Sequence, residues 1–184
     1  AYLDNTAVSD TTSPTLGLNS KGVRVVHDGF TYNNHSIDVD YFYTPYSLVT
    51  VEIGNENIAE LKIFEERGPE KISHVELAFG LAKGQKIGQS NAVIIYDIDF
   101  QGNGLVSQTD PDNVIDDDTL RVEHEIVNCS SSFNGEQCLL VRIYHTFRSN
   151  LDFDIVATNV WDASNNSWQN FYNHGIHVQG QSIN

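Results

Sequence analysis

Short runs in which apolar and polar residues alternate recur along this chain, and this period of two strongly limits what it can fold into. In the segment 59–63, for example, Ala59, Leu61 and Ile63 alternate with Glu60 and Lys62. Such alternation is typical of antiparallel strands with one face in a core and the other in water. Similar strands are predicted at 36–43, 47–53, 59–63, 75–79, 92–99, 119–127, 138–147, 151–160 and 174–179.

The spacing of these runs predicts an all-β fold. Turn residues separate the runs, and the only helix expected is a short one around 69–73. We therefore expect a single antiparallel β-sandwich of about nine or ten strands, Ig-like or jelly-roll-like, over residues 21–184. Residues 1–20 are rich in Asp, Asn, Thr and Ser and show no sustained periodicity. They are predicted to form an extended N-terminal arm.

Cysteine usage and sequons predict an exported protein. Cys129 and Cys138 flank a loop-like segment, so we expect a disulfide that clamps a hairpin, with two buried thiols as the alternative. Three N-x-Ser/Thr sequons, at Asn34, Asn128 and Asn165, predict a glycoprotein. The sequence has no methionine, which is explained most simply by removal of a signal peptide before Ala1. The expected location is therefore secreted or on the cell surface.

The net charge limits the classes of partner that this protein is expected to bind. The 184 residues carry a net charge of −15, which repels nucleic acids and anionic membranes. No apolar stretch approaches the length needed to insert into a membrane. Cations are the natural counterpart of such a chain, although solubility alone also explains its acidity.

Two acidic segments are candidate calcium sites because calcium prefers carboxylate and amide oxygens on irregular backbone. Asp97 and Asp99 belong to the first segment and would share one strand face. The second contains Asp110, Asp112, Asp116, Asp117 and Asp118. The alternative is two solvated acidic loops, since neither segment has the spacing of an EF-hand.

His124 and His145 form a candidate copper or zinc pair. Each falls on the apolar face of its predicted strand. If Cys129 lies directly opposite Cys138, the two imidazoles become diagonal neighbours within about 8 Å. The alternative is that each histidine is a hydrogen-bonded core residue. His174 and His177 are further candidates only if Gly175 bends the chain.

Aromatic residues gather at 41–46 and at 161–172, where they could stack on sugar rings or belong to the core. No nucleophile, metalloprotease or phosphate-loop motif is present, so a non-enzyme is predicted.

Several motifs resemble a group of uncharacterised secreted proteins from ammonia-oxidising archaea. The matching segments are DGFTY (28–32), DYFYTPY (40–46), RGPE (67–70), LAFGLAKGQ (77–85), IVATNVWD (155–162) and YNHG (172–175). The resemblance implies an archaeal protein exported from a copper-using cell, and this group carries no established activity.

The leading hypothesis is an extracellular structural or interaction module, a subunit of a surface filament, layer or matrix, with calcium as a stabilising ligand. It would associate with itself through the N-terminal arm, whose apolar residues could add to an exposed sheet edge of a neighbour. The alternatives are an extracytoplasmic copper- or zinc-binding domain that uses His124 and His145, and a carbohydrate-binding module.

Overall fold

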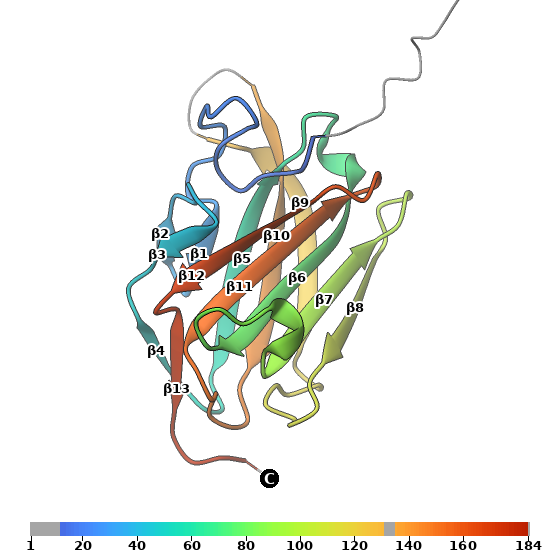
Figure 1. The fold of residues 1–184 in the computed structure, drawn as a ribbon. Helices are drawn as coiled ribbons and strands as arrows, with labels where there is room; N and C mark the ends of the chain where they lie inside the picture. Colours follow the sequence, from blue (N-terminus) through green and yellow to red (C-terminus); the bar gives the residue numbers. More distant parts are fainter. Residues whose placement is uncertain (1–11, 131–134, 184) are drawn as a thin grey trace, which may run out of the picture.

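Two β-sheets packed face to face form the body of the protein, as Figure 1 shows. The computed structural model describes residues 12–130 and 135–183. One sheet has five strands in the order β2 (His35–Ile37), β1 (Phe30–Tyr32), β5 (Glu56–Phe64), β10 (Gln137–Thr146) and β9 (Arg121–Asn128). The other has six, in the order β3 (Tyr43–Pro45), β12 (Ser167–Asn173), β11 (Ile155–Asp162), β6 (Ile72–Leu81), β7 (Ala92–Ile98) and β8 (Gly104–Thr109).

A two-stranded sheet of β13 (Ile176–Gln179) and β4 (Val49–Glu52) completes the architecture. The expected helix at 69–73 is the single 3-10 turn η2 (Pro69–Lys71), and a second turn, η3 (Ile87–Gln89), follows β6. The described residues contain no α-helix. The prediction of an all-β sandwich is therefore confirmed.

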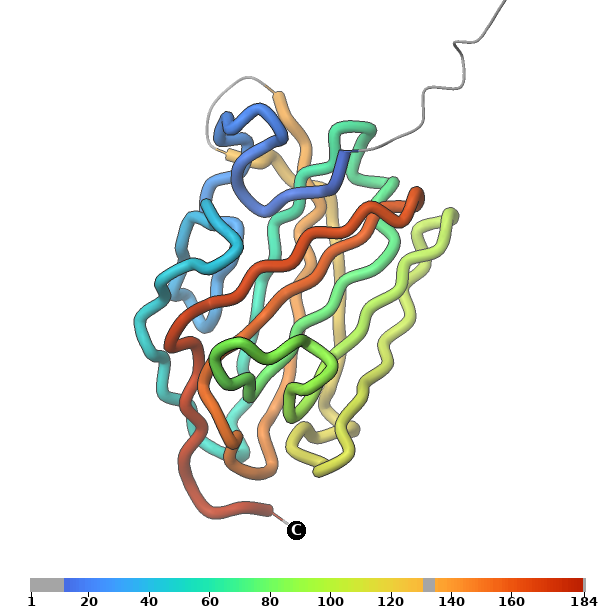
Figure 2. The backbone as a smooth tube through the Cα atoms, in the orientation of Figure 1, coloured from blue at the N-terminus to red at the C-terminus, as the bar shows by residue number. Residues whose placement is uncertain are grey.

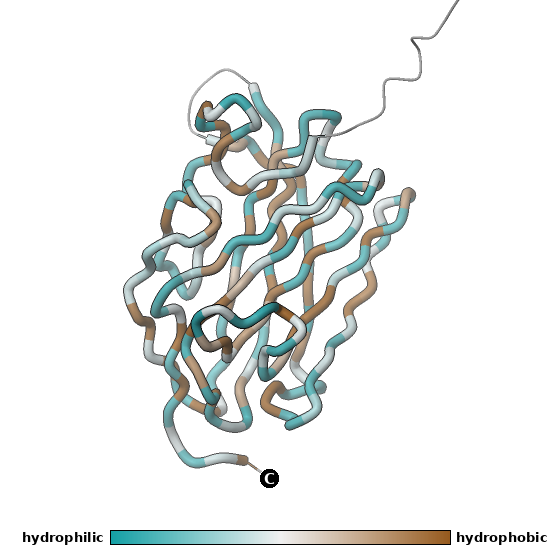
Figure 3. Tube along the Cα trace, viewed as in Figure 1, coloured by the Kyte–Doolittle hydropathy of each residue, from teal (hydrophilic) through white to brown (hydrophobic). Residues whose placement is uncertain are grey.

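The core lies between the two large sheets and is built from the alternating positions of long strands. Ala59, Leu61 and Ile63 of β5 are fully buried, as predicted, and face the equally buried inward positions of β6. Brown and teal alternate along these strands in Figure 3. A second, smaller buried cluster lies on the outer side of the six-stranded sheet and includes Ala78 of β6, Ala157 of β11 and Phe171 of β12. The six-stranded sheet is thus covered on part of its outer face as well.

The prediction of one strand over 36–43 is wrong. The chain leaves the edge of the five-stranded sheet after β2 and reaches the edge of the six-stranded sheet at β3. Val39 is buried as expected, but Tyr41, on the crossing between the sheets, is 68% exposed. Local alternation cannot reveal a crossing of this kind because both segments keep the same period of two.

The sandwich also differs from the expected one in strand number and direction. The described residues form thirteen strands, because the predicted strand 36–43 is divided between β2 and β3, and β1, β8 and β12 fall in segments where no strand was predicted. Two pairs are parallel, β12 with β3 and β13 with β4, while the remaining ladders are antiparallel. These parallel pairs join segments far apart in the sequence, so no hairpin turn imposes the antiparallel direction.

The described part of the predicted arm contacts the sandwich of its own chain. Thr15 and Phe64 exchange backbone hydrogen bonds of 2.9 and 2.8 Å, and the side chain of Leu16 is fully buried in the main core. Gly17 lies so close to Val39 that a Cβ atom would collide with the Val39 carbonyl. Residues 14–17 are therefore fixed on the sandwich, whereas residues 1–11 lie outside the described residues.

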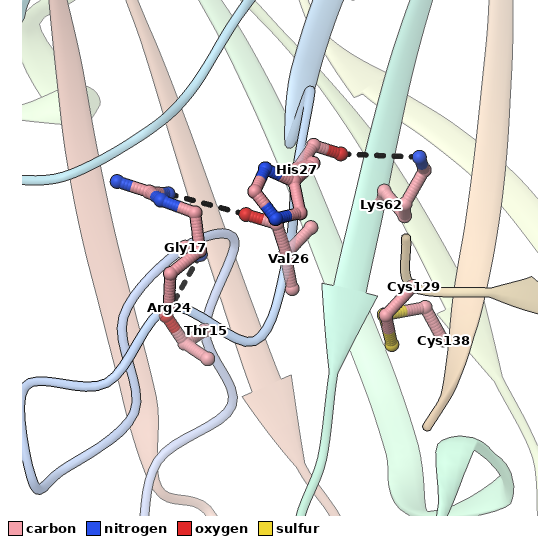
Figure 4. Close-up of a disulfide and its surroundings, with 8 residues drawn as sticks. All are labelled: Thr15, Gly17, Arg24, Val26, His27, Lys62, Cys129 and Cys138. Carbon is pink, nitrogen blue, oxygen red and sulfur yellow. Dashed lines mark hydrogen bonds between the residues drawn. A yellow bond between two sulfur atoms is a disulfide. The ribbon is translucent and has the colours of Figure 1, made fainter. Parts of the chain in front are cut away.

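The predicted disulfide between Cys129 and Cys138 is present and fully buried. It lies beside Val26 and His27, and Figure 4 shows Lys62 donating to the His27 carbonyl at 3.1 Å. The His27 amide donates to the Cys129 carbonyl at 3.3 Å. The disulfide therefore ties the β9–β10 hairpin to the segment that follows the arm.

Candidate functional site

Two of the predicted calcium ligands, Asp99 and Asp110, each accept two hydrogen bonds from backbone amides of their own loops. Asp110 accepts hydrogen bonds from the amides of Val114 and Ile115 at 2.9 and 2.8 Å. Asp99 accepts from the amides of Gln101 and Asn103, both at 2.9 Å. The hydrogen bond from Asn103 outweighs desolvation and lowers the pKa of Asp99. These carboxylates cap turns, which is a structural role.

The other acidic candidates are dispersed. Asp116 accepts from the Thr119 hydroxyl at 2.9 Å, while Asp112, Asp117 and Asp118 are exposed. Asp97 contacts His74 on the neighbouring strand, whereas Asp99 caps the turn that follows β7. Across residues 12–130 and 135–183, no three His, Cys, Asp or Glu side chains are grouped to hold a metal ion.

The register of the β9–β10 hairpin separates His124 from His145. His124 pairs with Val141 and not with Ile143, because the disulfide joins diagonal positions and Cys129 pairs with Glu136. His145 lies four residues beyond Val141 on β10, about 13 Å along the strand. The expectation that these imidazoles are diagonal neighbours within about 8 Å is therefore wrong.

Each of the two histidines has its own partner. His145 is fully buried, accepts from the Tyr32 hydroxyl at Nε2 (2.6 Å) and donates from Nδ1 to the Ile143 carbonyl (3.0 Å). Burial lowers the pKa of His145 to about 4, so this imidazole is neutral in the core. His124 is half-buried with Nδ1 2.5 Å from the Tyr96 hydroxyl. His174 and His177 are both exposed.

The two aromatic segments are divided between the core and the surface. Tyr46 and Tyr172 contact Phe30 in the core, with ring centroids 5.7 and 4.1 Å from that of Phe30. Tyr43 and Phe42 lie against Phe171 on the outer side of the six-stranded sheet. The core interpretation thus holds for part of each segment only.

Five side chains on the outer face of the six-stranded sheet form what we call the outer-face cluster: His74, Glu76, Asp97, Asn159 and Trp161. His74 contacts Asp97 at 2.5 Å through Nδ1 and Glu76 at 2.9 Å through Nε2. Its ring stacks on Trp161 with centroids 4.2 Å apart. Asn159 donates to the second Glu76 oxygen at 3.2 Å.

Electrostatics in the outer-face cluster favour an imidazolium between two carboxylates. Desolvation alone would lower the pKa of His74, but its hydrogen bonds to Glu76 and Asp97 outweigh this and raise it. The hydrogen bond from His74 in turn lowers the pKa of Glu76 against the effect of burial. A charged ring stacked on an indole gains a further cation–π attraction.

A hollow beside this cluster, which we call the outer groove, has a volume of about 370 Å³. It lies between the sheet and the segment around η3, which crosses the sheet face in Figure 2. Its lining includes Glu76, Lys86, Ser90, Ile95, Thr109 and Gln169. Glu76 therefore belongs to both the outer-face cluster and the outer groove.

A second hollow, the seam groove, lies where the β7–β8 turn meets β9 and η2, and has a volume of about 190 Å³. Apolar side chains dominate its lining, which includes Pro69, Ile72, Ile98, Phe100, His124 and Ile126. Phe100 is 95% exposed and Ile126 is 53% exposed. Within the described residues, β9 is an edge strand that pairs only with β10.

Sequence reasoning missed both grooves. The alternation of His74 and Glu76 with buried Val75 and Leu77 does place the two polar residues on one outward face. It does not reveal that β7 and β11 bring Asp97 and Trp161 beside them, since that depends on strand order.

No protein family, no curated protein and no solved structure matches this chain. The disulfide indicates folding in an oxidising, extracytoplasmic environment. No helix in the described ranges is long and apolar enough to cross a membrane. The side chains of Asn34, Asn128 and Asn165 are exposed, and their glycosylation stays a prediction.

Proposed function

We propose that this protein is an extracytoplasmic building block that assembles head-to-tail into a filament, layer or matrix. The observation that carries the proposal is the apolar seam groove beside the free edge of β9. An exposed strand edge offers unpaired N–H and C=O groups, and an adjacent apolar groove can accept alternate side chains of an added strand. We also propose, as the sequence predicts, that the sandwich is Ig-like or jelly-roll-like.

The occupant that we assign to the seam groove is the segment 1–11 of a second copy. This segment contains Tyr2, Leu3 and Val8 among polar residues, and in an extended strand Tyr2 and Val8 fall on one face and Leu3 on the other. Eleven residues reach at most about 40 Å when extended, which lets the segment extend well beyond its own domain. Anchoring of residues 14–17 in their own sandwich gives such a segment a fixed starting point.

Head-to-tail geometry follows because donor segment and acceptor groove are different surfaces of one molecule. A contact of this kind propagates unless the rotation closes a ring. The net charge of −15 opposes the approach of two copies, so assembly should strengthen as salt screens the repulsion. Calcium binding remains a separate prediction, and this mode of assembly needs neither calcium nor the His124/His145 pair, whose rings the strand register separates.

Sedimentation of the full chain and two variants at high salt tests the proposal. The full chain should polymerise, whereas deletion of residues 1–11 and Ile126→Asp should each give a folded monomer. The matched control is Leu48→Asp, which places the same charge on another exposed apolar residue and should still polymerise. A full chain that stays monomeric at high concentration contradicts the proposal, and so does a polymer that survives the deletion.

A further inference from the structure

The outer groove combines an apolar floor with a ring of polar groups. Ile87, Val93 and Ile95 supply apolar surface, and Lys86, Thr109 and Gln169 stand around it. Small-molecule sites usually have this composition, with a few polar groups that fix the ligand's orientation. Among the described residues, the side chains of Thr109 and Gln169 make no hydrogen bond and Lys86 makes no ion pair, so all three can bind a ligand.

The groove continues into a row of side chains that crosses five strands. Backbone pairing places Gln169, Asn159, Glu76, Ile95 and Ser107 opposite one another on β12, β11, β6, β7 and β8. Neighbouring strands lie about 4.8 Å apart, so this row spans roughly 19 Å. Its length favours an extended ligand that lies across the strands.

Two buried polar atoms of β11, one in this row and one two residues beyond it, have no hydrogen-bond partner among the described residues. Asn159 is only 6% exposed, and its Oδ1 is unpaired although its Nδ2 donates to Glu76. The indole nitrogen of Trp161 is likewise buried and unpaired. Leaving a buried polar group unpaired costs about 1–3 kcal/mol, so these atoms favour a bound polar group or water beside them.

We propose that the outer groove is a binding site for a neutral, hydroxyl-rich ligand, a short stretch of glycan. Sugar hydroxyl groups both donate and accept, and the groove offers the acceptor Glu76, the donor Lys86, and the groups of Thr109 and Gln169, which do both. The apolar floor suits the C–H face of a sugar ring. The site includes Gln169 of the segment 161–172, but no aromatic side chain of either segment lines the groove.

The charges of the groove disfavour ionic ligands. Lys86 and Glu76 carry opposite charges, and each Glu76 oxygen already accepts one hydrogen bond, from His74 or Asn159, which leaves one lone pair on each oxygen for a ligand. An anionic ligand would also meet the repulsion of a chain with net charge −15. Hydrogen bonds to a neutral ligand avoid both costs, and the hydrogen bonds from His74 and Asn159 hold the Glu76 carboxylate in place.

The test is a titration of the isotope-labelled full chain with cello-, malto-, chito- and mannohexaose, followed by amide chemical shifts. We expect at least one hexasaccharide to shift the amides of Ile95, Thr109 and Gln169 while that of Ile126 in the seam groove stays fixed. Shifts confined to other regions would overturn the proposal, as would the absence of binding by all four sugars. The deletion of residues 1–11 keeps the sample monomeric if the full chain polymerises.

A matched pair of variants then assigns the binding to the groove. Gln169→Ala should weaken binding of the responding sugar by about tenfold, the loss of 1.4 kcal/mol expected for hydrogen bonds to one side chain. Gln179→Ala removes an exposed glutamine from β13 and should leave the affinity unchanged. Equal affinities of Gln169→Ala and the wild type would overturn the assignment. This experiment measures sugar affinity and not sedimentation, so its result tests the glycan site independently of the proposed assembly.

Discussion

Acid should destabilise this protein through one buried histidine, His145. Burial lowers the pKa of this imidazole from 6.5 to about 4, so the folded state keeps it neutral while the unfolded chain takes up a proton. The stability tied to the neutral ring is fully present above pH 6.5 and is lost as the pH falls toward 4. At 1.36 kcal/mol per pKa unit, the loss amounts to about 3 kcal/mol.

Comparison with a variant that cannot titrate isolates this contribution from that of the carboxylates. His145→Gln removes the ionisable ring from its place between Tyr32 and Phe79. Urea denaturation at a series of pH values gives the free energy of unfolding of each protein. The advantage of the wild type over the variant should shrink by about 3 kcal/mol between neutral pH and about pH 4.

His74 provides a control of opposite sign. Its pKa is raised in the folded state, so the stability it contributes is present below pH 6.5 and is lost as the pH rises through the folded pKa. The wild type should therefore gain on His74→Gln as the pH falls. A wild-type advantage over His145→Gln that stays constant with pH would refute the reasoning, because the buried ring would then bind its proton equally in both states. If His145→Gln does not fold, NMR titration of the wild-type imidazole decides the same question.

Two further predictions concern loops. Reducing the disulfide, or replacing both cysteines by alanine, should lower the free energy of unfolding by about 2–3 kcal/mol, as measured by urea denaturation, and unchanged stability would contradict the clamp. Asp110→Ala leaves the amides of Val114 and Ile115 without their acceptor and should cost about 1–3 kcal/mol, whereas the exposed Asp112→Ala should stay within about 0.5 kcal/mol. In the same samples, calcium bound by this loop would raise the melting temperature and EDTA would lower it. A melting temperature that changes with neither addition would mean that Asp110 only caps its turn.

Local alternation predicted the long central strands because burial on one face is written directly into their sequence. Ala59, Leu61 and Ile63 of β5 show this, and every one of them is fully buried. The edge strand β8 was missed because its six residues, Gly104–Thr109, are mostly exposed and lack alternating apolar residues. Such a strand forms because β7 offers a partner, and the identity of that partner is not a local property.

The candidate sites were harder to predict for a related reason. The expected His124/His145 pair depended on a register, and a shift of two residues was enough to separate the rings. The outer-face cluster depends on strand order, which brings His74, Asp97 and Trp161 together from three separate strands. Residue types identify candidates for binding, whereas register and strand order decide which of them meet.

The two grooves can operate together because one strand keeps them apart. Val93 at the beginning of β7 lines the outer groove, and Ile98 at its end lines the seam groove, about 17 Å further along the strand. Assembly through the seam groove would therefore leave the outer groove open on every subunit. A polymer would then present many copies of a weak glycan site, and linked sites bind a repeating ligand far more tightly than one site alone. The proposed assembly would thus compensate for the modest affinity of a single groove of about 370 Å³. Each subunit needs only a weak glycan site for the whole polymer to bind a repeating glycan tightly.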